Sequence, residues 1–224
     1  MLRIAIDGAC RRNGKPDCIS SGGVYVHRLN ADGTVQDHGL FALTEEKSTN
    51  QRGELLALHR ALRYIFDMQD DAIIITDSEY IFNTMTKNWC DRWDSNGWKT
   101  ASGEQVKNRD LWEKIYAVAK FLSDTGRDVS YYHIKGHCIP FGAVTADRLL
   151  SEDDTGEKLY KEVQKKFDAV ASTKKDIFAK AQKLSEVNNG FELAPDIFKE
   201  FVVMNTVVDA IASTEVTNID AHRI

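Results

Sequence analysis

Four carboxylates stand where the sequence could build a reactive site: Asp7, Glu54, Asp77 and Asp147. Asp7 lies within or at the end of the first β-rich stretch, and Asp77 directly follows the apolar run 72–75. Open α/β sheets place their sites at the carboxyl ends of such strands. Four converging acids repel one another, and a pair of divalent cations relieves that cost. Oxygen ligands favour Mg²⁺ or Mn²⁺ over zinc, and two such ions can drive phosphodiester hydrolysis.

Each acid also has a simpler interpretation when it is taken alone. Asp77 could be the cap or turn residue of the helix that follows it. Glu54 could be a solvated acid in a first helical turn, favoured by the helix dipole. Asp147 could be a surface residue of a helix. Only the four together favour a metal site.

The elements that must position these acids follow from the hydrophobic pattern. Alternating β-rich stretches predict strands, and the Asp-Gly at 32–33 predicts a hairpin. Apolar residues at helical spacing predict helices. The predicted strands are 2–9, 21–30, 35–43, 72–76 and 128–134, and the predicted helices are 48–66, 78 to about 93, 109–122 and 144–152.

This order predicts an α/β fold over residues 1–152: a five-stranded mixed sheet with helices on both faces. A crossover of the usual kind makes the first and fourth strands neighbours, which brings Asp7 close to Asp77. The helices would then carry Glu54 and Asp147 to the same sheet edge.

The segment 153–224 differs in character and predicts a helical hairpin. Seven apolar residues mark one face of a long first helix: Leu159, Val163, Phe167, Val170, Ile177, Ala181 and Leu184. Pro195 suits the first turn of a second helix. One interpretation is that the hairpin packs on the core. The other is a protein-interaction or self-association surface made by Phe198, Phe201, Val202 and Val208.

Composition narrows the class of protein. The chain has 224 residues, 42% hydrophobic and 28% charged, which is typical of a globular protein. No apolar run approaches the ~18 residues of a membrane span, and Asp7 interrupts the start too early for a signal-peptide core. We therefore expect a cytoplasmic protein with no membrane contact. The four cysteines have no CxxC spacing and are expected to be reduced thiols. The formal net charge of −5 argues mildly against a nucleic-acid partner.

Several motifs, in order, resemble those of type 1 ribonuclease H over residues 1–152. They are "IDGACRRNG", "STNQRGELLAL", "TDSEY", "GWKTASGEQVKNRDLW" and "HIKGH" followed by "TADRLL". The resemblance implies a ribonuclease H-like fold and the family's metal-binding carboxylates at Asp7, Glu54, Asp77 and Asp147. It implies a catalytic role for His137, in proton transfer or product release, which suits a side chain that titrates near neutrality.

The resemblance also implies a substrate and cofactors. It places Asn13, Asn50 and Gln51 at the minor groove of an RNA–DNA hybrid, and Thr49 at a phosphate. Thr49 is also suited to capping the helix that follows it. The wide, shallow minor groove of an RNA-bearing helix shows 2′-hydroxyls, which amides and hydroxyls can bind without reading base sequence. The implied cofactors are two Mg²⁺ ions, for which Mn²⁺ can substitute.

The sequence departs from the family pattern in three places. In the segment 87–108, which corresponds to the family's basic protrusion, acids dilute the basic residues. Glu79 adds an acid just after Asp77-Ser78. The segment between His137 and Asp147 lacks the usual Asn-Glu pair, although the ten-residue spacing is kept.

The function that these motifs indicate is an endoribonuclease. It would hydrolyse the RNA strand of RNA–DNA hybrids by a two-metal-ion mechanism, with little sequence preference. Its cellular tasks would be primer removal in DNA replication and the clearing of hybrids. The alternatives are a DNA junction nuclease of the same fold and a non-catalytic hybrid-binding adaptor.

Overall fold

The structure, a computed structural model, describes residues 1–11, 15, 17–137, 155–189 and 193–213. Its five strands form one mixed sheet with the order β3-β2-β1-β4-β5. The strands are β1 (Leu2–Arg11), β2 (Ile19–Leu29), β3 (Val35–Glu46), β4 (Ala72–Thr76) and β5 (Val129–His133). All five predicted strands are therefore confirmed.

Pairing within the sheet follows the predicted crossover. β1 runs antiparallel to β2 and parallel to β4, and β4 runs parallel to β5. The register pairs Ala5 with Ile75, so Asp7 and Asp77 each lie two residues further along neighbouring parallel strands. The two aspartates are thus brought to the same end of the sheet.

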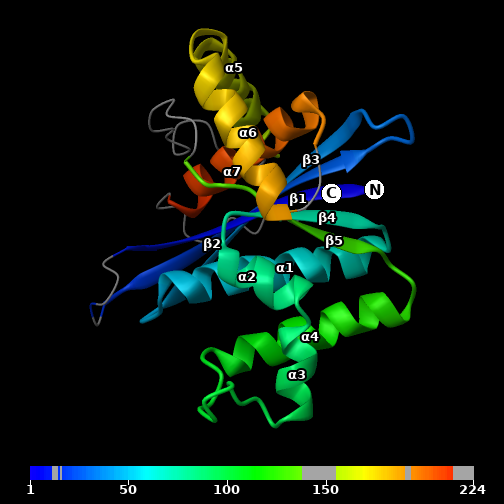
Figure 1. Cartoon of the computed structure of the whole chain (residues 1–224), viewed down its shortest axis with the longest axis vertical. Coiled ribbons are helices and arrows are strands. Elements are labelled where there is room, and N and C mark those ends of the chain that lie inside the picture. Colours follow the sequence, from blue (N-terminus) through cyan, green and yellow to red (C-terminus); the bar gives the residue numbers. More distant parts are fainter. Residues whose placement is uncertain (12–14, 16, 138–154, 190–192, 214–224) are drawn as a thin grey trace.

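Helices cover both faces of the sheet (Figure 1). They are α1 (Asn50–Met68), α2 (Glu79–Thr86), α3 (Trp89–Ser95), α4 (Arg109–Asp124), α5 (Glu157–Thr173), α6 (Lys175–Asn189) and α7 (Pro195–Ala212). α1 to α4 lie on one side, and α5 to α7 lie on the other (Figure 1). This arrangement confirms the predicted mixed sheet with helices on both faces.

Two hydrophobic cores result, because successive side chains of a strand point to opposite faces. On β1, Leu2, Ile4 and Ile6 belong to the core under α1, whereas Ala5 belongs to the core under α7. On β4, Ile75 also belongs to the core under α7. The next residues in phase with these are Asp7 and Asp77, so both aspartates point to the face covered by α7.

Two predicted helices are interrupted. The helix expected from 78 to about 93 divides into α2 and α3, and Asn88 between them takes the left-handed conformation with φ 54°. The long helix expected after residue 153 ends at Thr173, and α6 begins at Lys175. Ile177 and Leu184, which were expected on its apolar face, are 40% and 39% exposed. The predicted helical C-terminal segment is therefore confirmed, but its described residues form three helices and not the two of a hairpin.

α7 packs directly on the sheet. Phe198, Phe201, Val202 and Val208 are buried in the core under this helix, so they form no exposed surface for a partner. Glu200 on α7 makes an ion pair with Arg3 on β1 and accepts a hydrogen bond from His27 Nδ1 on β2 at 2.9 Å. Of the two interpretations of this segment, packing on the core holds for α7. A domain boundary at residue 152 stays a prediction.

One expectation about the cysteines is wrong. Cys10 and Cys18 form a disulfide between the end of β1 and the residue before β2. The hairpin geometry brings them together, since Cys10 lies opposite Ser20 in the β1–β2 register. Cys90 is a buried free thiol. Among the described helices, none is long and apolar enough to cross a membrane.

Candidate active site

Asp7 stands near the middle of β1, where the strand passes beneath α7. Its side chain is 8% exposed, and the Gly8 N–H donates a hydrogen bond to Asp7 Oδ1 at 2.7 Å. A carboxylate buried this deeply is costly unless it is paired or binds a cation.

Glu54 reaches Asp7 because α1 approaches the sheet very closely. A Cβ added to Gly8 would lie 2.8 Å from Glu54 Cγ and closer still to the Glu54 backbone nitrogen. Only glycine fits between the strand and the helix at this point. The Glu54 carboxylate accepts hydrogen bonds from Ser78 Oγ at 2.6 Å and from Asn50 Nδ2 at 3.0 Å. Its orientation is therefore fixed from both sides.

Arg52 fixes the start of α1 in the same place. Its guanidinium donates to Glu45 on β3 at 2.6 and 2.9 Å, and to Asp110 on α4 at 2.8 and 2.9 Å. The side-chain hydroxyl of Thr49 accepts from the Arg52 N–H, as expected of an N-cap residue. These contacts hold the first turn of α1, and with it Glu54.

Asp77 follows β4 directly and is enclosed by β5, its loop and α7. Its backbone carbonyl lies 3.1 Å from His133 Nε2 on β5. A Cβ added to Gly136 would overlap Asp77 Oδ2, so the loop after β5 touches this carboxylate through a glycine. The side chain of Asn205 on α7 hydrogen-bonds to the Asp77 carboxylate.

The three acids interact electrostatically. Burial, and then the charges of Asp77, Asp209 and Glu54, raise the pKa of Asp7 well above its usual range. Burial also raises the pKa of Asp77 and, together with the charge of Asp77, that of Glu54. Each carboxylate is thus destabilised in its charged form, and a cation between them would remove that penalty.

The donor set fits a hard divalent cation in its chemistry but is not arranged around one. Within the described ranges, no three Asp, Glu, His or Cys side chains are placed so that they could hold a metal ion. Glu54 instead accepts hydrogen bonds from Asn50 and Ser78. One buried and two partly buried carboxylates nevertheless supply the oxygen ligands that Mg²⁺ and Mn²⁺ prefer.

The other predicted site residues fall in three groups. His137 is described; it has φ 50°, and its Nδ1 lies 3.9 Å from Asp209 Oδ2 on α7. Asn13 and Asp147 lie outside the described residues. Thr49, Asn50 and Gln51 begin α1, next to the acids.

Two grooves meet at the start of α1. One, of about 550 Å³, is lined by Thr49, Asn50, Gln51, Lys107 and Asn108. The other, of about 540 Å³, shares Gln51 and Lys107 with the first and continues to Trp89, Arg92 and Lys99. Trp98 is buried and contacts the rings of Trp93 and Tyr116, so it packs the protrusion together.

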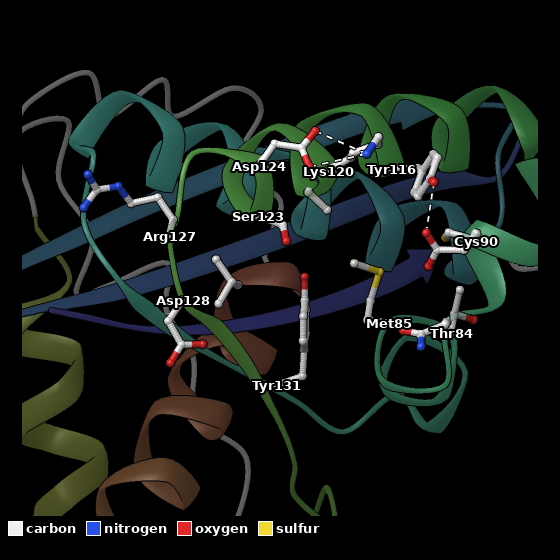
Figure 2. A pocket seen from close by; sticks show the side chains of 14 residues that line it. Thr84, Met85, Cys90, Tyr116, Lys120, Ser123, Asp124, Arg127, Asp128 and Tyr131 are labelled. Carbon is white, nitrogen blue, oxygen red and sulfur yellow. Dashed lines mark hydrogen bonds and ion pairs between the residues drawn. The ribbon is translucent and has the colours of Figure 1, made fainter.

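A third hollow lies away from the acids, between β5, α2 and α4 (Figure 2). Around it, Tyr116 donates a hydrogen bond to Asp91 at 3.0 Å and Lys120 pairs with Asp124 at 3.2 Å (Figure 2). None of the predicted site residues lines this hollow, and the polar groups named here already have partners.

Comparison with known proteins places the chain in a family. The family model described as RNase H matches residues 2–154. The chain belongs to the ribonuclease H family.

Curated ribonucleases H resemble the chain over the same region. The chain is 36% identical over 137 residues to the ribonuclease H of Nitratidesulfovibrio vulgaris, which covers 61% of this chain and 78% of the relative. It is 37% identical over 134 residues to that of Caldicellulosiruptor saccharolyticus, which covers 60% of this chain and 82% of the relative.

Solved structures support the same fold. LC9-RNase H1, described as a type 1 RNase H with the type 2 active-site motif, superposes with a TM-score of 0.51. It is 26% identical, and the match covers 61% of this chain and 63% of LC9-RNase H1. The PFV RNase H domain gives a TM-score of 0.51 at 19% identity over 64% of this chain and 84% of that domain, which shows the fold alone.

The ribonuclease H match ends before α7, and α7 carries two site residues that the sequence reasoning missed. Asp209 adds its charge to those around Asp7 and Asp77, and Asn205 bonds to Asp77. The sequence contained one signal for these residues. The family pattern has an Asn-Glu pair before its last carboxylate, and the segment before Asp147 contains no asparagine. Asn205, in contrast, precedes Asp209 by one helical turn.

Proposed function

We propose that the chain is a metal-dependent endoribonuclease that hydrolyses the RNA strand of RNA–DNA hybrids with little sequence preference. Membership of the ribonuclease H family supports hydrolytic nuclease activity. The observation that carries the proposal is the convergence of Asp7, Glu54 and Asp77 at one end of the sheet, next to the groove at the start of α1.

Asp7, Glu54 and Asp77 are the described residues that would hold two Mg²⁺ ions, with Mn²⁺ as a substitute. When bound, such ions activate a water molecule and stabilise the leaving oxygen of a phosphodiester. Ser78 and Asn50 orient Glu54 for this task, and the loop glycine Gly136 keeps the approach to Asp77 narrow.

The start of α1 would bind the hybrid in its minor groove. Asn50 donates through Nδ2 to Glu54, which leaves its carbonyl oxygen able to accept from a 2′-hydroxyl. Gln51 is exposed and lines both grooves. These groups recognise the sugar of an RNA strand and carry no information about base sequence.

The second groove would take the DNA strand. Arg92, Lys99 and Lys107 supply positive charge along it, and Glu104 in the same groove reduces that charge. Few phosphate contacts predict modest affinity and a shallow salt dependence.

His137 would serve proton transfer or product release. Its side chain is 78% exposed and lies near the acidic end of the sheet, 3.9 Å from Asp209. The exposed imidazole is open to solvent and to a substrate bound at this end of the sheet.

The test is cleavage of a labelled RNA–DNA hybrid in Mg²⁺ and in Mn²⁺ by wild type and by Asp77→Asn. Duplex DNA, duplex RNA and a DNA junction are the control substrates. We expect only the hybrid to be cut, and the variant to lose at least ~10²-fold in rate, the size of effect seen when one charge-stabilising group is removed from an active site. Binding of the hybrid without cutting in either metal would instead support an adaptor, and cutting of the junction alone would support a junction nuclease.

A further inference from the structure

α7 covers the face of the sheet to which Asp7 and Asp77 point. A Cβ added to Gly23 on β2 would lie 2.9 Å from the Val208 carbonyl oxygen, so the helix lies close against the strand backbone. The last turn is held from below, since Ser21 Oγ donates to the Ala212 carbonyl and Arg11 donates to the Ser213 carbonyl at 3.2 Å. The position of Asp209 relative to β1 is therefore fixed.

Asp209 faces the acidic end of the sheet from this helix. Its Oδ2 lies 3.9 Å from His137 Nδ1, and its side chain is 35% exposed. The residue is thus half-buried at the rim of the site, on the opposite face of the sheet from Glu54. A carboxylate in that place adds a fourth charge to a centre that already has three.

Asn205 provides an independent observation that this side of the site receives a ligand. It is only 6% exposed, and it stands one helical turn before Asp209, so the two share a face of α7. Its amide bonds to the Asp77 carboxylate, while its Oδ1 has no hydrogen-bond partner among the described residues. A buried acceptor of this kind is normally satisfied by water, an ion or a bound group.

We propose that Asp209 is a metal-binding carboxylate of this active site, and that Asn205 is a positioning residue that orients Asp77. The catalytic centre is then completed by α7, from beyond the matched ribonuclease H region, and residues 155–189 form an insertion between the two parts of the site. The inference rests on the proposed function for its chemistry, but it is tested by metal binding as well as by cleavage.

The experiment uses full-length, metal-stripped protein and four forms: wild type, Asp209→Asn, Asp147→Asn and Asp196→Asn. Asp196 is an exposed acid in the first turn of the same helix and serves as the matched control. Mn²⁺ affinity is measured by calorimetry, and the melting temperature is measured in EDTA and in Mn²⁺. Hybrid cleavage is recorded alongside.

We expect Asp209→Asn to weaken Mn²⁺ binding at least tenfold and to lose most of the metal-induced rise in melting temperature. In EDTA the same variant should melt higher than wild type, because one repelling charge is gone. If Asp209 had only a structural role, its replacement by asparagine would instead lower the melting temperature in EDTA. Asp196→Asn should match wild type in all three measurements.

Asp209→Cys provides a second test of whether residue 209 is a metal ligand. A thiolate prefers softer ions, so a ligand at this position should shift the preference of the site from Mn²⁺ toward Zn²⁺. An unchanged preference in a folded Asp209→Cys protein would count against a ligand role.

Two outcomes overturn the inference: wild-type Mn²⁺ affinity in Asp209→Asn, or loss of binding in Asp147→Asn alone. Loss of binding in both variants still makes Asp209 a ligand. If wild type cuts no hybrid, the proposed function fails, while the calorimetry still decides whether Asp209 binds the metal.

Discussion

The two faces of the sheet bring acids to the same end of it by different routes. On one face, α1 follows β3 directly and places Glu54 against Gly8. On the other, α7 comes from the C-terminal part of the chain, packs through Val208 against Gly23 of β2, and places Asp209 3.9 Å from His137. The first arrangement depends on contacts between consecutive elements, and the second depends on contacts about 190 residues apart, such as Arg3 with Glu200 and Ser21 with Ala212. A site assembled in this way needs both ends of the chain.

Removal of α7 should have the largest effect. The helix buries Phe198, Phe201, Met204 and Val207 completely or nearly so. Since each buried side chain contributes about 1.5–3 kcal/mol, their loss is comparable with the whole ~5–15 kcal/mol stability of a domain. We expect a chain that ends at Asn189 to be unfolded or aggregated by circular dichroism and size exclusion.

A chain that ends at Ser213 keeps α7 whole and is the matched control. If the shorter chain folds with an unchanged melting temperature, the second face is dispensable. The conclusion that the fold needs both faces would then be wrong.

The sequence was informative about the first face because its signals are local. Asp7 lies within one strand and Asp77 directly follows another, both with a clear apolar pattern, and the crossover rule makes β1 and β4 neighbours. Thr49 and Glu54 follow from the start of an amphipathic helix. The centre could therefore be predicted from short segments, without knowledge of the rest of the chain.

The second face gave only one short signal, the spacing of Asn205 and Asp209, and no local pattern that places its helix on the sheet. α7 is buried on nearly all sides, so its pattern predicts a helix but does not indicate which face of the sheet it covers. Asp209 depends on the fit of that helix against Gly23, which local periodicity cannot reveal. The Cys10–Cys18 disulfide and the break after Thr173 were missed for a similar reason, since hairpin closure and helix packing decide them.

Two glycines allow the faces to be compared directly. We expect Gly8→Ala to destabilise the protein by about 2–3 kcal/mol, within the usual range for overpacking, and Gly23→Ala by about 1 kcal/mol. The difference arises because the new methyl at position 8 meets the Glu54 backbone at once, whereas the one at position 23 lies 2.9 Å from the Val208 oxygen. Urea denaturation of both variants measures the two losses.

Each variant is a control for the other, because both replace a strand glycine with alanine. That change by itself tends to stabilise a strand, so any loss of stability comes from the contact with the helix. Equal losses of unfolding free energy would mean that α1 and α7 are displaced equally easily by the added methyl group. The two faces would then differ only in how far apart in the sequence their contacting residues lie. A larger loss for Gly23→Ala would reverse the comparison.

The smallest expected effect is a pH dependence of the metal-free protein. Burial, followed by the charge of Asp77, raises the pKa of Asp7 in the folded state above its unfolded value of about 4. The folded protein then binds more protons than the unfolded chain between these two pKa values, so this group lowers stability as the pH rises through that interval. In EDTA, Asp7→Asn should therefore melt at nearly the wild-type temperature near pH 4 and increasingly above it toward pH 7.

The difference between the two proteins isolates this effect. Burial and the charge of His27 lower the pKa of His38 to about 4, and Arg52 lowers the pKa of Glu45, so both of these groups make stability rise with pH. They are common to wild type and variant and cancel in the difference. Saturating Mg²⁺ should then reverse the order at pH 7, because the cation stabilises the charged Asp7 that the variant lacks. A melting-temperature difference that is constant from pH 4 to pH 7 would mean that burial and the neighbouring acids do not raise the pKa of Asp7. The acids from the two faces would then not share one centre.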